Sequence, residues 1–447
     1  MKQESKSFYK LVFSLVVPMA LQNLINVAVT SADVVMLGRV GETVLSGSSL
    51  AGQWQFILTL LYFGLTSGAA VLTAQYWGKK DTRTIEKVIG IAMRFSLIAG
   101  FLFLAAVWIM PEQIMMIFTP EAPVIAEGVK YLKIVSFSYV FMAITTVYLN
   151  IMRSVERVVI STIVYLTSLL VNIGINAVLI FGLLGFPAMG IEGAAIGTLI
   201  ARFVELMIVV VYANRNKVIR FRPRDLFVRD PLLFRDFLRY SIPVTLNELM
   251  WGAGSSMNAV VLGHLGSPAV AANSVAQVAR QLATVIAFGI ANAAAILIGK
   301  AIGEENYDRA KDYAKRLVKV TLVTGLAGAA VVLIARPIVL SVMNLTPLAK
   351  DYLSFMMIVM SYFVFCQAYN TTMVVGIFRS GGDTKFGLFL DVSSMWGCSI
   401  LLGAIAAFVL GWDVKLVYVL LMSDEIIKIP FTTWRYKSMK WMRNVTR

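Results

Sequence analysis

Three carboxylates in this 447-residue sequence lie inside long apolar stretches: Asp33 near the end of the first stretch, Glu248 about midway along a later one, and Asp391. An ionised acid at the centre of a membrane helix costs about 2.5–3.5 kcal/mol on insertion scales. No basic residue lies within one helical turn of Glu248, and Asp391 is similarly unpaired locally. An unpaired carboxylate at such depth must be protonated, hydrated in a cavity or bound to a cation. These residues therefore predict proton or cation binding.

Amide side chains are placed to complete a site at Asp33. Asn172 and Asn176 are four residues apart and share one helix face. Their oxygens, with the Asp33 carboxylate, are ligands that a hard cation such as Na⁺ accepts, and their amides are equally suited to fix a protonated acid. Thr198 is a weaker candidate of the same kind. The alternatives remain open: hydrogen bonding between helices for the amides, and a solvated helix end before Gly38 for Asp33.

The other charged residues within apolar stretches have an oppositely charged residue nearby or lie close to the end of their helix. Arg202 with Glu205, and Glu425 with Lys428, are three apart and predict local ion pairs. We expect Asp383 to close a turn and to pair with Arg379 or Lys385. The side chains of Arg94 and Arg280 are expected to extend to the ends of their helices. Trp251, with Glu248 and Asp391, is expected to form part of a cavity wall for apolar cations.

The composition shows what surrounds these residues. The chain is 58% hydrophobic and only 15% charged, which predicts an integral membrane protein. Its net charge of +15 comes from short basic clusters between apolar runs, a pattern of membrane topology that does not suggest a nucleic-acid partner. The two cysteines lack motif spacing and His264 is the only histidine, which leaves little for zinc or histidine catalysis. The N-terminal run lacks a signal-peptide cleavage pattern and is read as a retained helix.

Twelve apolar segments are long enough to span a bilayer, which takes about 20 residues. They are residues 11–37, 52–77, 88–110, 130–152, 160–182, 190–213, 237–262, 278–300, 317–338, 351–378, 385–411 and 414–434. The polar stretch 214–236 separates six from six. Lys and Arg concentrate in alternate loops, in this connector and in the C-terminal tail, so both termini are predicted to be cytoplasmic.

The two halves repeat one another. Pro18 aligns with Pro243 at an offset of 225 (243 − 18), and Arg153 aligns with Arg379 at 226. Glu205 matches Glu425 at an offset of 220. Because each half has an even number of spans, the repeats are predicted to be parallel, as in one class of secondary transporter. We therefore expect an all-α membrane protein of two pseudo-symmetric six-helix bundles around a central cavity, with an N-lobe (1–213), a cytoplasmic connector (214–236) and a C-lobe (237–447).

Over nearly its whole length the sequence resembles the multidrug and toxic compound extrusion (MATE) transporters. The resemblance rests on the order and spacing of short elements: Pro18 and Asp33-Val34-Val35-Met36-Leu37-Gly38 in the first helix, Gly68 and Ala74-Gln75-Tyr76-Trp77-Gly78 in the second, Arg153 after the fourth, and Gly381-Gly382-Asp383 after the tenth. It implies export of cationic, amphipathic compounds in exchange for H⁺ or Na⁺, through a V-shaped cavity between the lobes.

Carried over by position, Asp33 matches the first-helix carboxylate of the family's N-lobe cation site, and Asn172 and Asn176 match the fifth-helix positions beside it. The second of these is often Asp in the family, so Asn176 weakens the case for Na⁺. Glu248 is similar to the seventh-helix Glu of the Na⁺-coupled branch but stands about one turn earlier relative to Gly266.

The sequence thus predicts a secondary active multidrug exporter of the plasma membrane, a monomer that needs no cofactor beyond its coupling ion. Three other readings stay open. A lipid-linked oligosaccharide flippase of the same superfamily would favour a cavity lined with Arg or Lys. A membrane-embedded hydrolase would need a His pair, a Ser-His set or two facing Asp motifs, none of which is visible. A channel gains no support from duplicated halves whose carboxylates lie at unequal depths.

Overall fold

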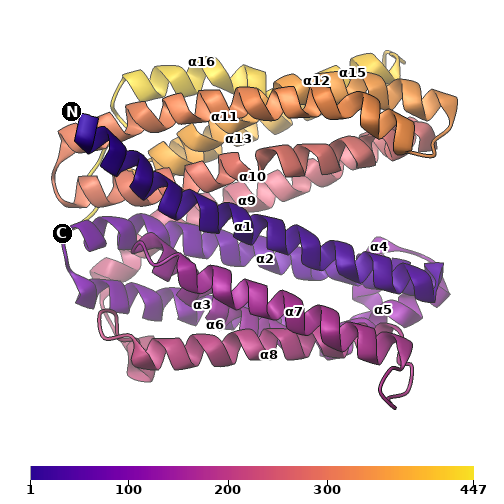
Figure 1. Ribbon diagram of the computed structural model, residues 1–447, viewed down its shortest axis with the longest axis horizontal. Coiled ribbons are helices and arrows are strands. Elements are labelled where there is room, and N and C mark those ends of the chain that lie inside the picture. The colour runs from indigo at the N-terminus through magenta and orange to yellow at the C-terminus, as the bar shows by residue number, and fades with distance from the viewer. Residues whose placement is uncertain (1) are drawn as a thin grey trace. The chain divides into compact units, whose positions relative to one another are not determined.

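The computed structural model describes residues 2–447, with side chains for 6–266 and 268–447, and the regular structure in that part of the chain is entirely helical (Figure 1). The first half contains α1 (Lys2–Val40), α2 (Glu42–Gly78), α3 (Thr82–Ile109), α4 (Pro111–Phe118), α5 (Ala122–Val135), α6 (Ser138–Ser154), α7 (Val159–Phe181) and α8 (Ile191–Arg215). The second half contains η1 (Pro223–Phe227), α9 (Pro231–His264), α10 (Ser267–Gly303), α11 (Tyr307–Val342), α12 (Pro347–Thr371), η2 (Thr372–Phe378), α13 (Thr384–Ser394), η3 (Met395–Ile400), α14 (Leu401–Phe408), α15 (Val414–Leu421) and α16 (Asp424–Lys437).

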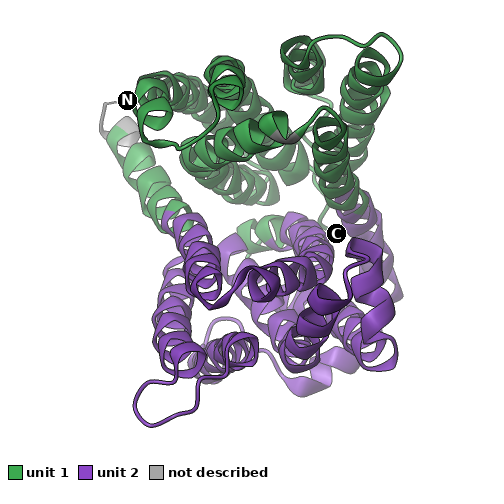
Figure 2. Ribbon diagram, turned by 90° about the vertical axis from the view of Figure 1, so that its right-hand side faces the viewer, with its two compact units in different colours: residues 1–20, 74–80, 246–447 green, residues 21–73, 81–245 purple. Residues whose placement is uncertain are grey.

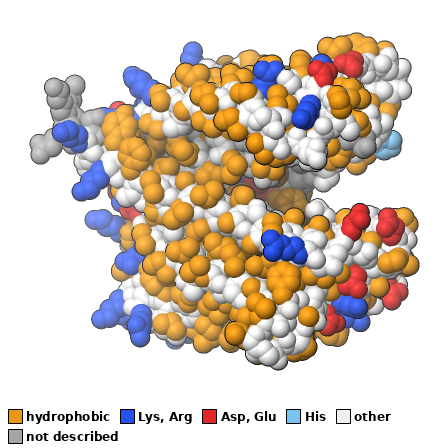
Figure 3. Space-filling model, turned by 45° about the vertical axis from the view of Figure 1, so that its right-hand side comes forward, with side chains coloured by type: hydrophobic (Ala, Val, Ile, Leu, Met, Phe, Trp, Pro, Cys, Tyr) orange, Lys and Arg blue, Asp and Glu red, His pale blue; other side chains and the backbone are white. Residues whose placement is uncertain are grey.

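The predicted spans all fall on helices. Among the described residues, nine helices are long and apolar enough to cross a membrane, or ten if α5 and α6, bent by 54° at their junction, form one span. The long helix α9 and the pair α15–α16, which is interrupted at Met422 and Ser423, occupy the other two predicted ranges. The face seen in Figure 3 is largely covered by hydrophobic side chains, with Lys, Arg, Asp and Glu in smaller groups among them.

The repeat extends to how helices begin. Asp81 caps α3 by accepting a hydrogen bond from the Thr84 amide, and Asn306 caps α11 in the same way from the Arg309 amide. The residues before these caps, Lys80 and Glu305, both have left-handed backbones, with φ of 61° and 58°. Each cap and each left-handed residue is 225 positions from its counterpart (306 − 81 and 305 − 80). Different residues therefore build the same turn twice, since Asp and Asn both serve as N-caps.

The chain divides into two compact units, coloured in Figure 2: unit 1, residues 1–20, 74–80 and 246–447, and unit 2, residues 21–73 and 81–245. Helix α1 passes from one unit to the other after Ala20, and α9 after Thr245. Both crossing points lie two residues beyond an internal proline, Pro18 or Pro243. Proline removes a backbone hydrogen bond and clashes with the preceding turn, so it favours a change of helix direction there.

Glycine lets helices cross closely within each unit. In unit 1, a Cβ on Gly303 of α10 would lie 1.8 Å from the Gln75 carbonyl oxygen of α2, and one on Gly78 would lie 2.1 Å from the Lys300 carbonyl oxygen. The two contacts are equivalent in the repeat, because Gln75 and Lys300 are also 225 apart. In unit 2, Gly68 of α2 meets Ser241 of α9 just as closely, at 2.3 Å from its Cα. These positions cannot carry a side chain without moving a backbone.

Candidate functional site

Unit 2 brings together the four polar residues that the sequence grouped around Asp33. The Asn176 amide on α7 donates hydrogen bonds to the Asp33 carboxylate on α1 at 2.6 Å and to the Asn172 oxygen at 3.2 Å. The Asn172 amide in turn donates to the Thr198 hydroxyl on α8 at 3.4 Å. Both asparagines are buried, since their four-residue spacing turns them to the same inner face of α7. The result is a continuous chain of hydrogen bonds that ends at a carboxylate.

Gly197 makes room for this arrangement. A Cβ on Gly197 would lie only 1.9 Å from the Asn176 side-chain oxygen. That oxygen is buried and has no hydrogen-bond partner within the described structure, whereas the amide nitrogen of the same side chain holds Asp33. An unmatched buried oxygen costs about 1–3 kcal/mol. The hydrogen bonds that the Asn176 amide donates to Asp33 and Asn172 offset this cost and fix the orientation of the side chain.

Asp33 borders a cavity of about 520 Å³ in unit 2. Its walls mix amides and hydroxyls with large soft side chains; among them are Asn23, Asn26, Gln55, Thr146, Phe56, Phe63, Tyr131 and Met142. Four charged residues also line it: Asp33, Arg153, Arg202 and Glu205. The predicted pair of Arg202 and Glu205 is confirmed, at 2.9 and 3.0 Å from one guanidinium nitrogen to both carboxylate oxygens.

The other two charges of the cavity have neutral partners. Arg153 donates to the side-chain oxygen of Gln22 at 3.3 Å and to that of Asn150. No Lys or Arg among the described residues forms an ion pair with Asp33, whose hydrogen bond comes from Asn176. Of the two carboxylates in this cavity, Glu205 is paired with Arg202, and Asp33 has an amide as its partner.

In unit 1 the expectation that Glu248 lacks a basic partner is wrong. Arg379 reaches it across helices, with 2.8 Å between the guanidinium and the carboxylate, and the two side chains are 5% and 14% exposed. The repeat explains the pairing. Arg153, the counterpart of Arg379, makes its contact with Gln22 of α1, one position before the counterpart of Glu248. In both halves the arginine therefore donates a hydrogen bond to a side-chain oxygen of the facing helix. The acceptor is the neutral Gln22 for Arg153 and the charged Glu248 for Arg379.

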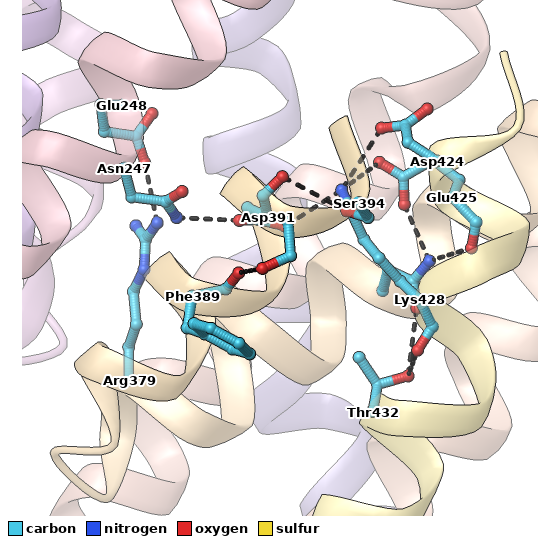
Figure 4. Close-up of polar contacts among 12 residues, drawn as sticks. Asn247, Glu248, Arg379, Phe389, Asp391, Ser394, Asp424, Glu425, Lys428 and Thr432 are labelled. Atoms are coloured by element: carbon cyan, nitrogen blue, oxygen red, sulfur yellow. Dashed lines mark hydrogen bonds and ion pairs between the residues drawn. The ribbon is translucent and has the colours of Figure 1, made fainter. Parts of the chain in front are cut away.

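Asp391 is also paired, contrary to the expectation from its neighbours in sequence. One carboxylate oxygen lies 3.0 Å from the Lys428 ammonium on α16, and the other accepts a hydrogen bond from Asn247 of α9 at 2.8 Å (Figure 4). Lys428 lies 3.1 Å from Glu425, which confirms the predicted local pair, and 3.4 Å from Asp424. Since Asn247 precedes Glu248, the two predicted acids of the second half do lie in one polar region, within separate ion pairs.

The remaining sequence expectations have mixed outcomes. Asp383 pairs with Arg435, at 2.7 and 3.1 Å, and not with Arg379 or Lys385. Arg94 does not extend freely to the helix end but donates to the carbonyl oxygens of Leu226 and Val228. Arg280 donates to the side-chain oxygens of Gln277 and Gln367. Trp251 is partly buried on α9, and no hydrogen bond joins it to Glu248 or Asp391 within the described residues.

Sequence reasoning missed two residues of this polar region, Asp424 and Asn247. A local signal existed for Asp424, because it stands four residues before Lys428 on α16, the spacing of an ion pair. Nothing local indicated Asn247 as the partner of Asp391, 144 residues away. Over the described part of the chain, no group of three or more His, Cys, Asp or Glu side chains is arranged to hold a metal ion.

A model of the protein family described as MatE matches the chain twice, over residues 18–178 and 243–405. The two matches begin 225 residues apart (243 − 18), which confirms the duplication predicted from the sequence. The chain is 22% identical over 419 residues to the probable multidrug resistance protein YoeA of Bacillus subtilis, covering 93% of this chain and 89% of that protein. It is 28% identical over 292 residues to the probable multidrug resistance protein NorM of Rhizobium meliloti, covering 64% and 62%.

The fold is similar to that of a solved structure described as the outward-facing conformation of a multidrug resistance MATE family transporter of the MOP superfamily. The TM-score is 0.86 at 18% sequence identity, over 96% of each chain. At this identity the likeness concerns the twelve-helix fold, which agrees with the architecture predicted from the sequence.

Proposed function

Because this chain belongs to the MatE family, and so is a multi-pass membrane transporter and not an enzyme, we propose that it exports cationic amphipathic compounds in exchange for H⁺ or Na⁺. The observation that carries the proposal is the environment of Asp33: a carboxylate at a cavity of about 520 Å³, held by an amide and by no basic side chain of the described residues. Two curated relatives that are called probable multidrug resistance proteins support the class of substrate.

The chemistry of exchange follows from competition for Asp33. An ionised Asp33 attracts an organic cation into the cavity, where aromatic and methionine side chains accept its apolar parts. A proton or Na⁺ arriving at the carboxylate removes that attraction and releases the compound. A membrane potential contributes about 2.3 kcal/mol per charge per 100 mV, and the ion gradient adds to it. Asn176 suits this role because an amide hydrogen-bonds to either form of the acid.

Orientation and location belong to the same proposal. The concentration of Lys and Arg in alternate loops, in the connector and in the C-terminal tail supports cytoplasmic termini by the positive-inside rule, and we assign the protein to the plasma membrane. In unit 1, Glu248 and Asp391 remain candidate coupling residues, now as members of ion pairs that protonation would break. Coupling through them would take the form of a change of salt-bridge partner.

The proposal is tested by efflux of ethidium from proteoliposomes under an imposed pH gradient or an imposed Na⁺ gradient. Asp33→Asn should lower gradient-driven efflux at least about tenfold, whichever ion drives it. Asp351→Asn is the matched control, since Asp351 is an exposed residue whose partner is Lys415. Efflux by Asp33→Asn at the wild-type rate would overturn the proposal.

The same preparation separates this function from lipid-linked oligosaccharide flipping. Arg153 and Arg202 do line the unit 2 cavity, but Arg202 is bound by Glu205 and Arg153 by neutral amides. We therefore expect ethidium to move and a pyrophosphate-linked polyprenol not to move. The opposite result would favour the flippase.

A further inference from the structure

In unit 1 the ammonium group of Lys428 lies among the carboxylates of Asp391, Asp424 and Glu425. We propose that Lys428 sets the ion specificity of the Asp391 region: its ammonium group fills the place of a Na⁺ ion among Asp391, Asp424 and Glu425, so this region exchanges protons and not Na⁺ (Figure 4). The inference rests on the proposed function, in which Asp391 takes part in coupling.

The geometry around the ammonium is complete. Its nitrogen lies 3.0 Å from Asp391, 3.1 Å from Glu425 and 3.4 Å from Asp424. A lysine ammonium has three N–H groups, and three carboxylates lie within ion-pair distance of this one, which donates a hydrogen bond to Glu425. Lys428 is 4% exposed, so water does not compete for these donors. A Na⁺ ion would need the same oxygens, and it would have to share them with a positive charge already in contact with all three.

Glu425 is fixed from its far side, which keeps Lys428 where it is. Asn370 of α12 donates to the Glu425 carboxylate at 2.8 Å and to its backbone oxygen at 2.6 Å. Thr432 donates to the oxygen of Asn370 at 3.2 Å. The three acids, which lie on α13 and α16, therefore surround one ammonium group, and Asn370 of α12 fixes Glu425. These contacts fix the position of the Lys428 side chain.

The carboxylates of this region outnumber its cations, so one of them can bind a proton. Three carboxylates face one ammonium, and Glu248 is neutralised separately by Arg379. From α10, Arg280 is close enough to interact with Asp424 and Glu425 but donates its hydrogen bonds to glutamines. Even when Arg280 is counted with Lys428, the three carboxylates leave one excess negative charge. The other titratable groups facing Asp424 or Arg280 are Tyr362, Cys366 and Tyr418, which are ordinarily neutral. A buried excess charge of this kind is relieved by binding a proton.

Asn247 is compatible with either protonation state of Asp391. Its amide nitrogen donates to Asp391, while its oxygen is buried and has no partner in the described structure. Turning the amide over would present that oxygen to a protonated Asp391, so the side chain matches both forms of the acid.

The test measures Na⁺ binding and not transport, so that it remains informative if the proposed export function fails. All proteins carry Asp33→Asn, which removes the unit 2 site from the comparison. Thermal unfolding of the purified protein is followed at increasing NaCl against choline chloride at equal ionic strength. With Lys428 present we expect no saturable Na⁺-specific rise in Tm. With Lys428→Met we expect one, at millimolar Na⁺, and its loss on adding Asp391→Asn.

Lys428→Arg, which keeps the charge, is the matched control and should behave like the protein with lysine. Lys428→Met combined with Asp424→Asn removes one charge of each sign and guards against misfolding of the single variant. Two results would overturn the inference: Na⁺-specific stabilisation in the presence of Lys428 that Asp391→Asn abolishes, or folded Lys428→Met variants that gain no Na⁺ response. Failure of ethidium efflux with a gained Na⁺ response would reject the proposed function alone.

Discussion

The guanidinium of Arg379 lies 2.8 Å from the carboxylate of Glu248, although the two residues are 131 positions apart. Both are largely buried, and removing one partner of a buried ion pair costs about 3–5 kcal/mol because the other charge is left unmatched. Glu248→Ala should therefore lower the Tm of the purified protein strongly. Glu248→Ala with Arg379→Met should recover much of the loss, since no orphaned charge remains. A double variant as unstable as the sum of its single variants would show that the two residues are not coupled.

Gly197→Ala tests whether Asn176 positions Asp33 for transport. The new methyl group would lie 1.9 Å from the Asn176 oxygen and must displace that side chain from the carboxylate. Ethidium efflux should fall by about tenfold while the protein still folds, because Asp33 loses the hydrogen bond that positions it. A tenfold change corresponds to about 1.4 kcal/mol. The matched control is Gly174→Ala on α7, where a Cβ meets no atom within 4 Å. Equal efflux by both variants would argue against the positioning role.

The symmetric crossing of α2 and α10 predicts a matched pair of destabilising substitutions. Gly78→Ala and Gly303→Ala each bring a methyl group within about 2 Å of a carbonyl oxygen of the other helix. Overpacking of this type costs about 1–3 kcal/mol, so both should lower Tm by similar amounts. Gly263→Ala, which meets nothing within 4 Å, should leave Tm unchanged. A large effect at one crossing residue and none at the other would contradict their equivalence.

Gln75 predicts how the C-terminal segment is held within unit 1. Its amide donates to the carbonyl oxygens of Ser380 and Arg443, at 2.7 and 3.0 Å, and its oxygen accepts from the Val445 amide at 2.7 Å. Gln75→Ala leaves these buried backbone groups unmatched, at about 1–3 kcal/mol each.

Limited trypsin digestion should then cleave Gln75→Ala after Arg443 several times faster than the wild type, as followed by mass spectrometry. Gln53→Ala, at an exposed position on the same helix, is the control. Unchanged protection in Gln75→Ala would show that Trp441, which is fully buried, retains the segment without help.

Local patterns in the sequence determined much of the molecule. Hydrophobic run lengths gave the helices, the offset of 225 gave the duplication, and the four-residue spacing of Asn172 and Asn176 placed both on one face towards Asp33. These features depend on residues close in sequence or on a repeated register. For the same reason the ion pairs within a helix, Arg202 with Glu205 and Glu425 with Lys428, could be predicted.

Only the tertiary structure decided which buried acids are free. Glu248 and Asp391 have no basic neighbour along the chain, yet Arg379 and Lys428 reach them from other helices. In a membrane a charge is stabilised by whatever lies within a few ångströms, and helix packing sets those neighbours independently of sequence distance. Asp33 escaped such pairing because its hydrogen bond comes from the Asn176 amide and the nearby Arg202 is engaged by Glu205. The sequence thus determined where the carboxylates lie, and the packing of helices determined what each one can bind.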